Sequence, residues 1–231
     1  ESGVPFFNPG PFAWPDWMTQ SMHVGKKICK ETFHIPANDP EASTARVRAI
    51  RLRGGDTIAY EEHVEVPVRD GALQADPARD ILKAVVFERH HASGTHAAGF
   101  VCGLGIHGAL AQTVAHDAHN LLVVGDNDAD MVIAANALVE CGGGAVAVVD
   151  GEILAKVPLQ VYGLMSTGEA AEVASRVCRM EQAWAAMGCK MPSPFMTLGL
   201  LSLACIPELR LTNRGYVDCT QFKFVPLEVG E

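Results

Sequence analysis

Short apolar segments alternate with clusters of polar residues through the central part of the chain. Residues 80–88 are apolar at most positions, which is typical of a central strand buried on both faces. Further strands are predicted over 98–104 and 121–124, each followed directly by a glycine. Because polar clusters lie close to these segments, the pattern predicts loops with polar side chains at one end of a sheet.

A hairpin is predicted nearer the N-terminus. Residues 45–52 and 60–68 have strand-like composition and are separated by a turn at 53–56. In the second strand valines alternate with other residues, so one face is expected to be buried and the other solvated. Pro67 places this strand at the edge of the sheet, because proline cannot donate a hydrogen bond to a neighbouring strand.

The second half of the chain changes to helical periodicity. The predicted elements are a helix over 126–140, a hairpin over 145–149 and 152–156, helices over 166–187 and 195–204, and an edge strand over 222–225. The first of these helices ends at Gly142-Gly143-Gly144, and Ser166 or Thr167 is expected to cap the second. Together the elements predict an α+β fold with a mixed, largely antiparallel β-sheet and packed helices.

The first 40 residues differ in composition from the rest. Prolines and aromatic residues alternate there, and this mixture disfavours a regular helix or a central strand. They include Pro5, Phe6, Phe7, Pro9, Pro11, Phe12, Trp14, Pro15 and Trp17. We therefore interpret 1–40 as a linker or docking arm and 41–231 as one domain. The aromatic residues of the arm either dock on another surface or strap the core of this domain.

Charge and cysteine usage narrow the function classes. A net charge of −9 and a pI near 5.4 argue against binding to nucleic acid or to an anionic membrane, because phosphate recognition needs a basic stripe. The seven cysteines are scattered without a CxxC pair, as expected for buried thiols in a reducing, cytoplasmic compartment. No apolar run approaches the roughly 20 residues of a membrane-spanning helix. Since the chain begins at Glu1, with neither an initiator methionine nor a signal-peptide pattern, we expect it to be a piece of a longer protein.

The densest polar cluster is the segment Ala115-His116-Asp117-Ala118-His119-Asn120. Such a density of polar groups is costly to bury without partners, so it indicates a functional site. His116 and Asp117 are candidates for general acid–base catalysis, and His119 and Asn120 for binding substrate or orienting the loop. Two alternatives stay open. One is a metal site, since two imidazoles and a carboxylate are suitable ligands, and the other is a polar turn in which the side chains cap backbone amides.

Two further clusters flank this segment. His90 follows the central strand and is a candidate to bind substrate or to pair with Asp117, with an ordinary surface histidine as the alternative. The aspartates within 126–130 alternate like calcium ligands, but the glycine and glutamate of an EF-hand are missing, so a helix N-terminus is the better interpretation. The glycine-rich run 103–108 lacks the spacing of a phosphate loop and predicts tight turns.

A series of motifs from residue 80 to the C-terminus matches one known family. The motifs are Glu88-Arg89-His90, Gly94, Gly99-Phe100, Gly103-Leu104-Gly105, Gly108-Ala109, Thr113-Val114-Ala115-His116-Asp117-Ala118-His119-Asn120, Val123-Val124-Gly125, Asn127-Asp128, Asp130-Met131, Gly142-Gly143-Gly144, Gly163-Leu164-Met165, Pro194-Phe195-Met196-Thr197-Leu198, Ile206-Pro207-Glu208-Leu209 and Phe224-Val225-Pro226-Leu227. With these motifs the chain resembles the C-terminal domain of bacterial adenine deaminase. Ala118, where a serine is usual, and the segment 91–93 depart from the family pattern, and these departures bear on the substrate.

The resemblance implies that a metal-dependent amidohydrolase barrel, with a small β-sandwich, precedes this domain in the complete enzyme. It implies hydrolysis of adenine to hypoxanthine and ammonia, with manganese or iron, or alternatively zinc, on the barrel. The barrel's metal-ligand motifs do not occur in this sequence, so this chain alone is expected to be catalytically incomplete, with no metal assigned to it. Its expected role is to lay the 116–120 segment and His90 over the barrel mouth, where they exclude water and hydrogen-bond the purine.

Two other functions are kept open at this point. One is a non-catalytic ligand-binding or oligomerisation domain that associates through the apolar helix 195–204. The other is a self-contained metallohydrolase that uses His90, His116, Asp117 and His119. Besides the upstream barrel, the expected partners are adenine as substrate and further copies of the chain in a homo-oligomer, with no nucleic acid and no membrane.

Overall fold

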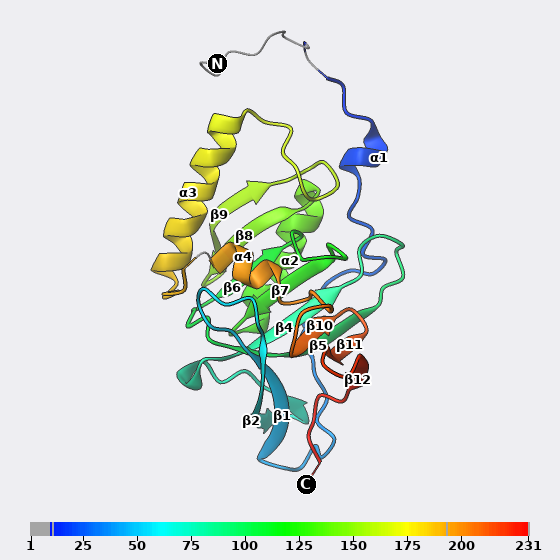
Figure 1. The fold of residues 1–231 in the computed structure, drawn as a ribbon, viewed down its shortest axis with the longest axis vertical. Helices are drawn as coiled ribbons and strands as arrows, with labels where there is room; N and C mark the ends of the chain where they lie inside the picture. The colour runs from blue at the N-terminus through cyan, green and yellow to red at the C-terminus, as the bar shows by residue number, and fades with distance from the viewer. Residues whose placement is uncertain (1–9, 11, 193, 231) are drawn as a thin grey trace.

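A nine-stranded sheet forms the centre of the molecule (Figure 1). The computed structural model describes residue 10, residues 12–192 and residues 194–230. The strands are β1 (Thr44–Arg51), β2 (Tyr60–Arg69), β3 (Ala72–Leu73), β4 (Ile81–Phe87), β5 (His96–Cys102), β6 (Ala109–Gln112), β7 (Leu121–Gly125), β8 (Gly144–Val149) and β9 (Glu152–Pro158). Their order is β3-β2-β1-β5-β4-β7-β6-β8-β9, with β1 and β5 parallel and the other neighbours antiparallel. The predicted mixed, largely antiparallel sheet is confirmed.

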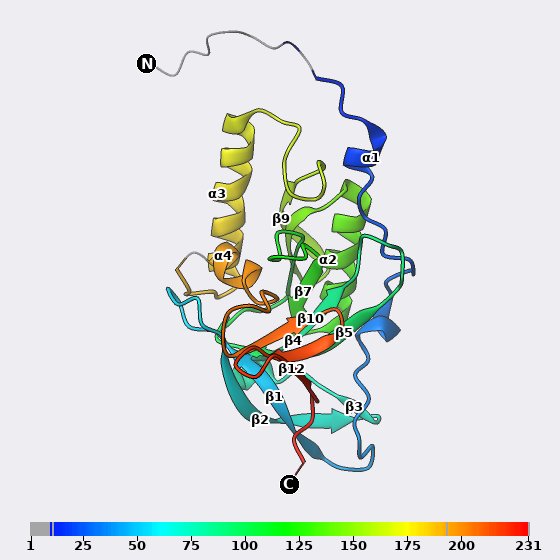
Figure 2. The same ribbon diagram turned by 45° about the vertical axis from the view of Figure 1, so that its right-hand side comes forward.

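Helices and a second, smaller sheet cover the two faces of the large sheet (Figure 2). The covering elements are α2 (Asp128–Cys141) and the 3-10 turn η1 (Lys30–Phe33) on one face, and α3 (Ala170–Ala186), α4 (Pro194–Gly199) and the sheet of β10 (Leu209–Thr212), β11 (Gly215–Asp218) and β12 (Lys223–Val225) on the other. Strand β4 shows why both faces are apolar. Leu82 and Val86 pack in the core that contains α3 and α4, whereas Val85 and Phe87 pack in the core that contains α2. The apolar run in the sequence is therefore that of a strand covered on both sides.

Most of the predicted elements are found close to their predicted bounds. Strand β4 is buried along its whole length and lies between β5 and β7, as predicted for a central strand. Helix α2 begins after Asn127, whose side chain accepts a hydrogen bond from the backbone N–H of Asp130. It ends at Gly142, which has a φ of 85°. The glycine run predicted the C-terminal end of this helix, whereas its N-cap, Asn127, was not singled out in the sequence.

Three predictions about the later elements are corrected. Helix α3 begins at Ala170 and not at 166, because Glu169 occupies the N-cap position and Ser166 bonds the N–H of Gly168 in a turn. Helix α4 ends at Gly199, well before the predicted residue 204. Strands β10 and β11 were not predicted. Four-residue strands carry too little alternation to stand out from the sequence.

The prediction of an edge position for Pro67 holds only in part. Strand β3 lies outside β2 in the sheet, so β2 is not the outermost strand. However, β3 pairs only with Val68 and Arg69, and the rest of β2, including Pro67, has no strand on that side among the described pairs. Proline is tolerated there because its missing N–H breaks no ladder bond.

The N-terminal segment lies along the molecule and joins its core only at the end. Ile28 and Phe33 are buried with α2, which supports the strap alternative for that part. Trp17 remains exposed, although its ring lies 5.7 Å from that of Tyr162. The prediction of no regular helix is wrong at α1 (Asp16–Thr19), a single turn whose N-cap is Pro15, a place where proline is tolerated. The residues Pro5, Phe6, Phe7, Pro9 and Pro11 lie outside the described residues.

The cysteines are all free thiols, in agreement with the absence of a disulfide framework. The prediction that they are buried is wrong for Cys178 and Cys205, which are exposed, while Cys102 and Cys219 are buried. Among the described helices, none combines the length and the apolar character that crossing a membrane requires.

Candidate functional site

The segment 113–120 forms the connection between β6 and β7, and we call it the His loop. Several hydrogen bonds fix its backbone. The N–H of His116 donates to the carbonyl oxygen of Gly199 at the end of α4 (2.8 Å), and the N–H of His119 donates to that of Ala115 (2.7 Å). The Ser202 hydroxyl also donates to the carbonyl oxygen of His116 (3.1 Å). The loop is thus held against the α4 side of the sheet.

The loop turns its two candidate acid–base groups towards solvent. The side chain of Asp117 is 78% exposed and that of His116 is 31% exposed, with Nδ1 of His116 4.0 Å from Oδ1 of Asp117. The two groups are therefore brought together, as acid–base chemistry requires, at a distance longer than a hydrogen bond. Nothing in the described part of the chain covers Asp117, so an incoming molecule can reach its carboxylate.

His119 points inward and lies against His116, with 5.1 Å between the ring centroids. Burial lowers the pKa of His119, and the neighbouring His116 and Arg89 lower it further. Its imidazole is consequently neutral at neutral pH. Its Nδ1 is buried and has no hydrogen-bond partner among the described residues.

His90 contacts the loop's backbone, and the expected pairing with Asp117 is not observed. Its Nε2 donates to the carbonyl oxygen of Ala118 (2.7 Å), and its ring is exposed. This contact fixes the tautomer, because a carbonyl can only accept a hydrogen bond. His90 therefore lies beside the loop without pairing with Asp117, and its role in binding substrate stays a prediction.

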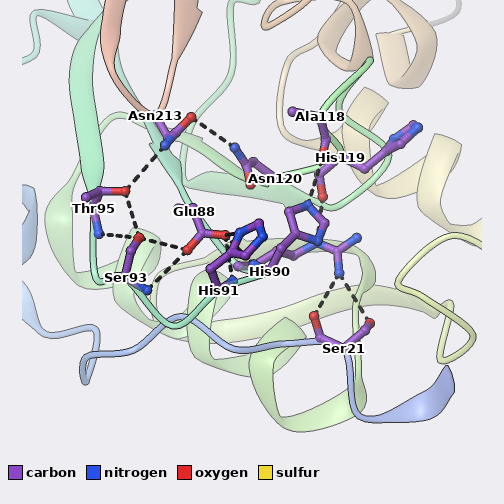
Figure 3. Close-up of polar contacts among 11 residues, drawn as sticks. Ser21, Glu88, His90, His91, Ser93, Thr95, Ala118, His119, Asn120 and Asn213 are labelled. Carbon is purple, nitrogen blue, oxygen red and sulfur yellow. Dashed lines mark hydrogen bonds and ion pairs between the residues drawn. The ribbon is translucent and has the colours of Figure 1, made fainter. Parts of the chain in front are cut away.

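Glu88 organises the turn that carries His90 (Figure 3). Its carboxylate accepts hydrogen bonds from the backbone N–H groups of His90, His91 and Ser93 and from the Ser93 hydroxyl. Burial acts to raise the pKa of Glu88, but these hydrogen bonds outweigh it and lower the pKa to about 2. A carboxylate that stays ionised thus holds the turn in place over the ordinary pH range.

Arg89 is a functional candidate that sequence reasoning missed. The residue is 1% exposed, and its guanidinium donates to the carbonyl oxygens of His119 (2.6 Å), Ser21 (3.0 Å) and Tyr162 (2.7 Å) and to the Ser21 hydroxyl. Burial lowers its pKa to about 10, so it remains a cation. The signal available in the sequence was a charged residue after a largely apolar strand, where exposure and burial are hard to tell apart.

Asn120 is 5% exposed, and a chain of polar contacts connects it with Glu88 (Figure 3). Its Nδ2 donates to Oδ1 of Asn213 in the β10–β11 turn (3.2 Å), and Nδ2 of Asn213 donates to the hydroxyl of Thr95 (3.4 Å). The Thr95 and Ser93 hydroxyls are 2.9 Å apart, and Ser93 bonds Glu88. The predicted loop-orienting role of Asn120 is consistent with these contacts.

Metal ligation was one alternative for this loop. Among the described residues, no group of three or more histidine, cysteine, aspartate or glutamate side chains is arranged to hold a metal ion. His90 bonds a backbone carbonyl, and His119 lies inside the loop while Asp117 points outward. The donor set that the sequence suggested therefore does not fit a metal, and we assign none to it.

The aspartates after β7 serve α2 and its surroundings. Asp128 forms an ion pair with the buried Lys83 (2.7 Å), and Asp130 accepts hydrogen bonds from the backbone N–H groups of Asp150 and Gly151. With Asn127 as the N-cap, the helix-terminus interpretation is confirmed. The Asp126 carboxylate contacts Nδ1 of His107 (2.6 Å), and this contact raises the pKa of His107.

Comparison with known proteins shows which family this sequence matches. The sequence model of the adenine deaminase C-terminal domain matches residues 56–223. An adenine deaminase of Clostridium botulinum (strain ATCC 19397 / Type A) is 54% identical over 221 residues, which are 95% of this chain and 37% of that protein. One of Moorella thermoacetica is 47% identical over 94% of this chain, and one of Dehalococcoides mccartyi is 38% identical over 99%. The chain spans 37–39% of the length of these relatives.

Proposed function

The chain belongs to the adenine deaminase C-terminal domain family, and on that basis we propose that it is the C-terminal part of an enzyme that hydrolyses adenine to hypoxanthine and ammonia. The proposal extends to the complete polypeptide, because the chain spans only 37% of its C. botulinum relative. We further propose that the upstream part forms a metal-dependent barrel and that the His loop closes on its mouth. The observation that carries the second step is the exposed Asp117 beside the half-buried His116, on a backbone fixed from several sides.

The reaction adds one water molecule to the ring carbon that bears the amine and releases that amine as ammonia. A divalent metal in the barrel, manganese or iron in the first place and zinc as the alternative, supplies the activation of water. The residues of this chain act on the substrate and on protons. The Asp117 carboxylate can accept a hydrogen bond from an N–H group of the purine. His116 beside it can donate or accept a proton as the amine leaves.

Two further predicted residues, His90 and Asn120, orient the loop in this proposal together with Arg89. His90 and Arg89 bind the consecutive carbonyl oxygens of Ala118 and His119, and Asn120 is bonded to Asn213. These contacts act on the backbone or at the loop's end and leave the exposed face of the loop free for the substrate. Preorganisation of this kind favours a loop that binds substrate without first having to order itself.

The test replaces His116 or Asp117 by alanine in the complete polypeptide and follows ammonia release from adenine. Loss of one positioned acid–base or substrate-binding group is expected to lower kcat/KM by at least about tenfold. His34→Ala provides a matched control, because His34 is an exposed histidine remote from the loop in sequence. Unchanged kinetics in both His-loop variants, with the fold intact, would reject the role proposed for the loop.

A further inference from the structure

Helix α3 leaves part of its apolar side uncovered. Val173, Val177, Met180 and Trp184 recur at helical spacing along one side of the helix. Met180 and Trp184 are 3% and 2% exposed, whereas Val177 nearer the N-terminus is 41% exposed. Both ribbon views show the first turns of α3 rising beyond β9, at the edge of the large sheet (Figures 1 and 2). An amphipathic helix is stabilised mainly by burying its apolar side, so the first half of α3 lacks a partner in the described chain.

A hollow of about 430 Å³ lies beside this uncovered side, and we call it the α3 groove. Its lining is largely apolar and includes Leu159, Leu164, Val177, Trp184, Phe195 and Met196. Met196 at its rim is 53% exposed. The indole N–H of Trp184 is buried and has no hydrogen-bond partner among the described residues. The apolar lining of this groove therefore suits an apolar occupant.

The α3 groove is continuous with the His loop. Helix α4 supplies Phe195 and Met196 to the groove and, at its end, the carbonyl oxygen that receives the N–H of His116. Val114, two residues before His116, also lines the groove. A segment bound in the groove consequently lies next to the His loop, which in the proposed function closes on the active site.

We infer that the α3 groove receives an apolar segment of the upstream part of the same polypeptide, and that this seating places the His loop over the barrel. The inference rests on the proposed function and identifies the part of the protein that binds beside the His loop. Two observations select this occupant. More than half of the length of the relatives lies outside the matched region, so a large body of protein is available to cover the groove. Docking of the upstream part at the α3 groove would also position the adjacent His loop more directly than docking at a surface far from the loop.

The decisive experiment places the photo-crosslinking amino acid benzoylphenylalanine at Met196 in the complete polypeptide. The expected result is a product of unchanged polypeptide mass on a denaturing gel, with the crosslinked peptide upstream of this chain. A product of doubled mass would identify a second copy as the occupant, and a crosslinked peptide from within this chain would show that its own residues cover the groove. Either result overturns the inference. So does a yield no greater than that from the probe at the exposed Cys178 of α3.

A pair of substitutions on α3 tests the consequence for function. Val177→Arg introduces a charge into the α3 groove, whereas Cys178→Arg introduces the same side chain about 100° further around the helix. We expect Val177→Arg to lower kcat/KM of the complete enzyme by about tenfold or more and Cys178→Arg to leave it within about twofold. Equal effects of the two substitutions would contradict a docking role for the groove.

The outcomes separate this inference from the proposed function. If His116→Ala abolishes ammonia release but the probe at Met196 labels a second copy, the proposed function stands and the docking inference fails. If the probe labels the upstream part but both His116→Ala and Asp117→Ala are fully active, the docking stands and the role of the loop fails.

Discussion

Arg89 combines complete burial with contacts to three separate segments of the chain. Its guanidinium bonds backbone carbonyls of the N-terminal segment, the His loop and the turn that contains Tyr162. None of these hydrogen bonds goes from the guanidinium to a carboxylate, so the dipoles of the backbone carbonyls stabilise its charge. The planar guanidinium of arginine has five N–H donors in fixed directions, so it can bond several carbonyl oxygens at once. The lysine ammonium cannot reproduce this geometry. Arg89 therefore orders the His loop from beneath.

Arg89→Lys is expected to loosen the loop. A single ammonium cannot reach all three carbonyls, and each buried acceptor left without a donor costs roughly 1–3 kcal/mol. In the complete polypeptide we expect faster hydrogen exchange in peptides covering 113–122 and a rise in the KM for adenine. A mere loss of folded enzyme would lower the maximal rate and leave KM unchanged.

Arg210→Lys is the matched control for this prediction. Arg210 is also 1% exposed and also donates only to backbone carbonyls in the described contacts, those of Thr57, Leu200, Ile206 and Pro207. Its loss should destabilise the fold to a similar degree without altering exchange in the His loop. If both variants change the loop equally, Arg89 has a general structural role and no specific one.

Glu88 gives a pH-dependent prediction. Its pKa in the folded chain is about 2, against the usual 4.5, so its contribution to stability is complete above about pH 4.5 and is lost as the pH falls towards 2. Glu88→Gln should lower the free energy of unfolding at pH 7 and flatten its dependence on pH between 5 and 2. Urea unfolding of this chain at several pH values measures both effects. The exposed Glu140→Gln should reproduce neither of them.

Single residues could be predicted from the sequence where their immediate sequence neighbours made them unusual. His116, Asp117 and His90 stood out because polar groups beside apolar strands need an explanation, and the fold brings them to one place. Asn213 and Arg89 could not be assigned in this way. Their contacts join residues 93 and 30 positions apart in the sequence, and no local pattern encodes such a pairing.

At the scale of elements, the end of α4 is set by a close approach of two backbones. A Cβ atom on Gly199 would lie 2.8 Å from the carbonyl oxygen of Val114. Gly199→Ala is therefore expected to displace α4 from the His loop and to destabilise the fold by about 1–3 kcal/mol. Thermal unfolding measures the loss of stability, and a parallel fall in kcat/KM of the complete enzyme would reflect the loss of the His116 anchor.

The control for this prediction is Gly230→Ala, because a Cβ at Gly230 meets no atom within 4 Å. Alanine is ordinarily favoured over glycine in a helix by up to about 1 kcal/mol. A stabilised Gly199→Ala variant with normal activity would accordingly show that α4 can shift without cost and that the close approach has no functional consequence.

Elements with strong local signals were predicted, and those shaped by tertiary contacts were not. Helix α2 carries its own caps, and β4 carries a nearly continuous apolar run, so both were located within two residues. The predicted helix 195–204 instead ends at Gly199, where the chain turns beside the His loop. Helix α3 was placed too early because Ser166 is a good capping residue that the fold uses in a turn.

At the scale of the whole molecule, the chain has its own cores, and in the proposed function its site is completed by other protein. Three clusters of buried apolar residues account for the fold. The candidate acid–base pair lies on the surface, and the α3 groove beside it is open. The sequence could predict the α+β fold and the loop, whereas in the proposed function the surface that completes the site belongs to protein outside this chain.

Incompleteness of this kind can be tested by comparing this chain with the complete polypeptide. We expect ammonia release from adenine and stoichiometric manganese or iron in the complete polypeptide, and neither property in this chain when both are purified and reconstituted identically. The reason is that the described residues offer no metal-holding group, whereas hydrolysis of an amidine carbon requires activated water. Elemental analysis and an ammonia assay give the two readings independently. Metal bound in a one-to-one ratio to this chain, and lost on replacing His116 and Asp117, would instead establish a metallohydrolase site within the His loop.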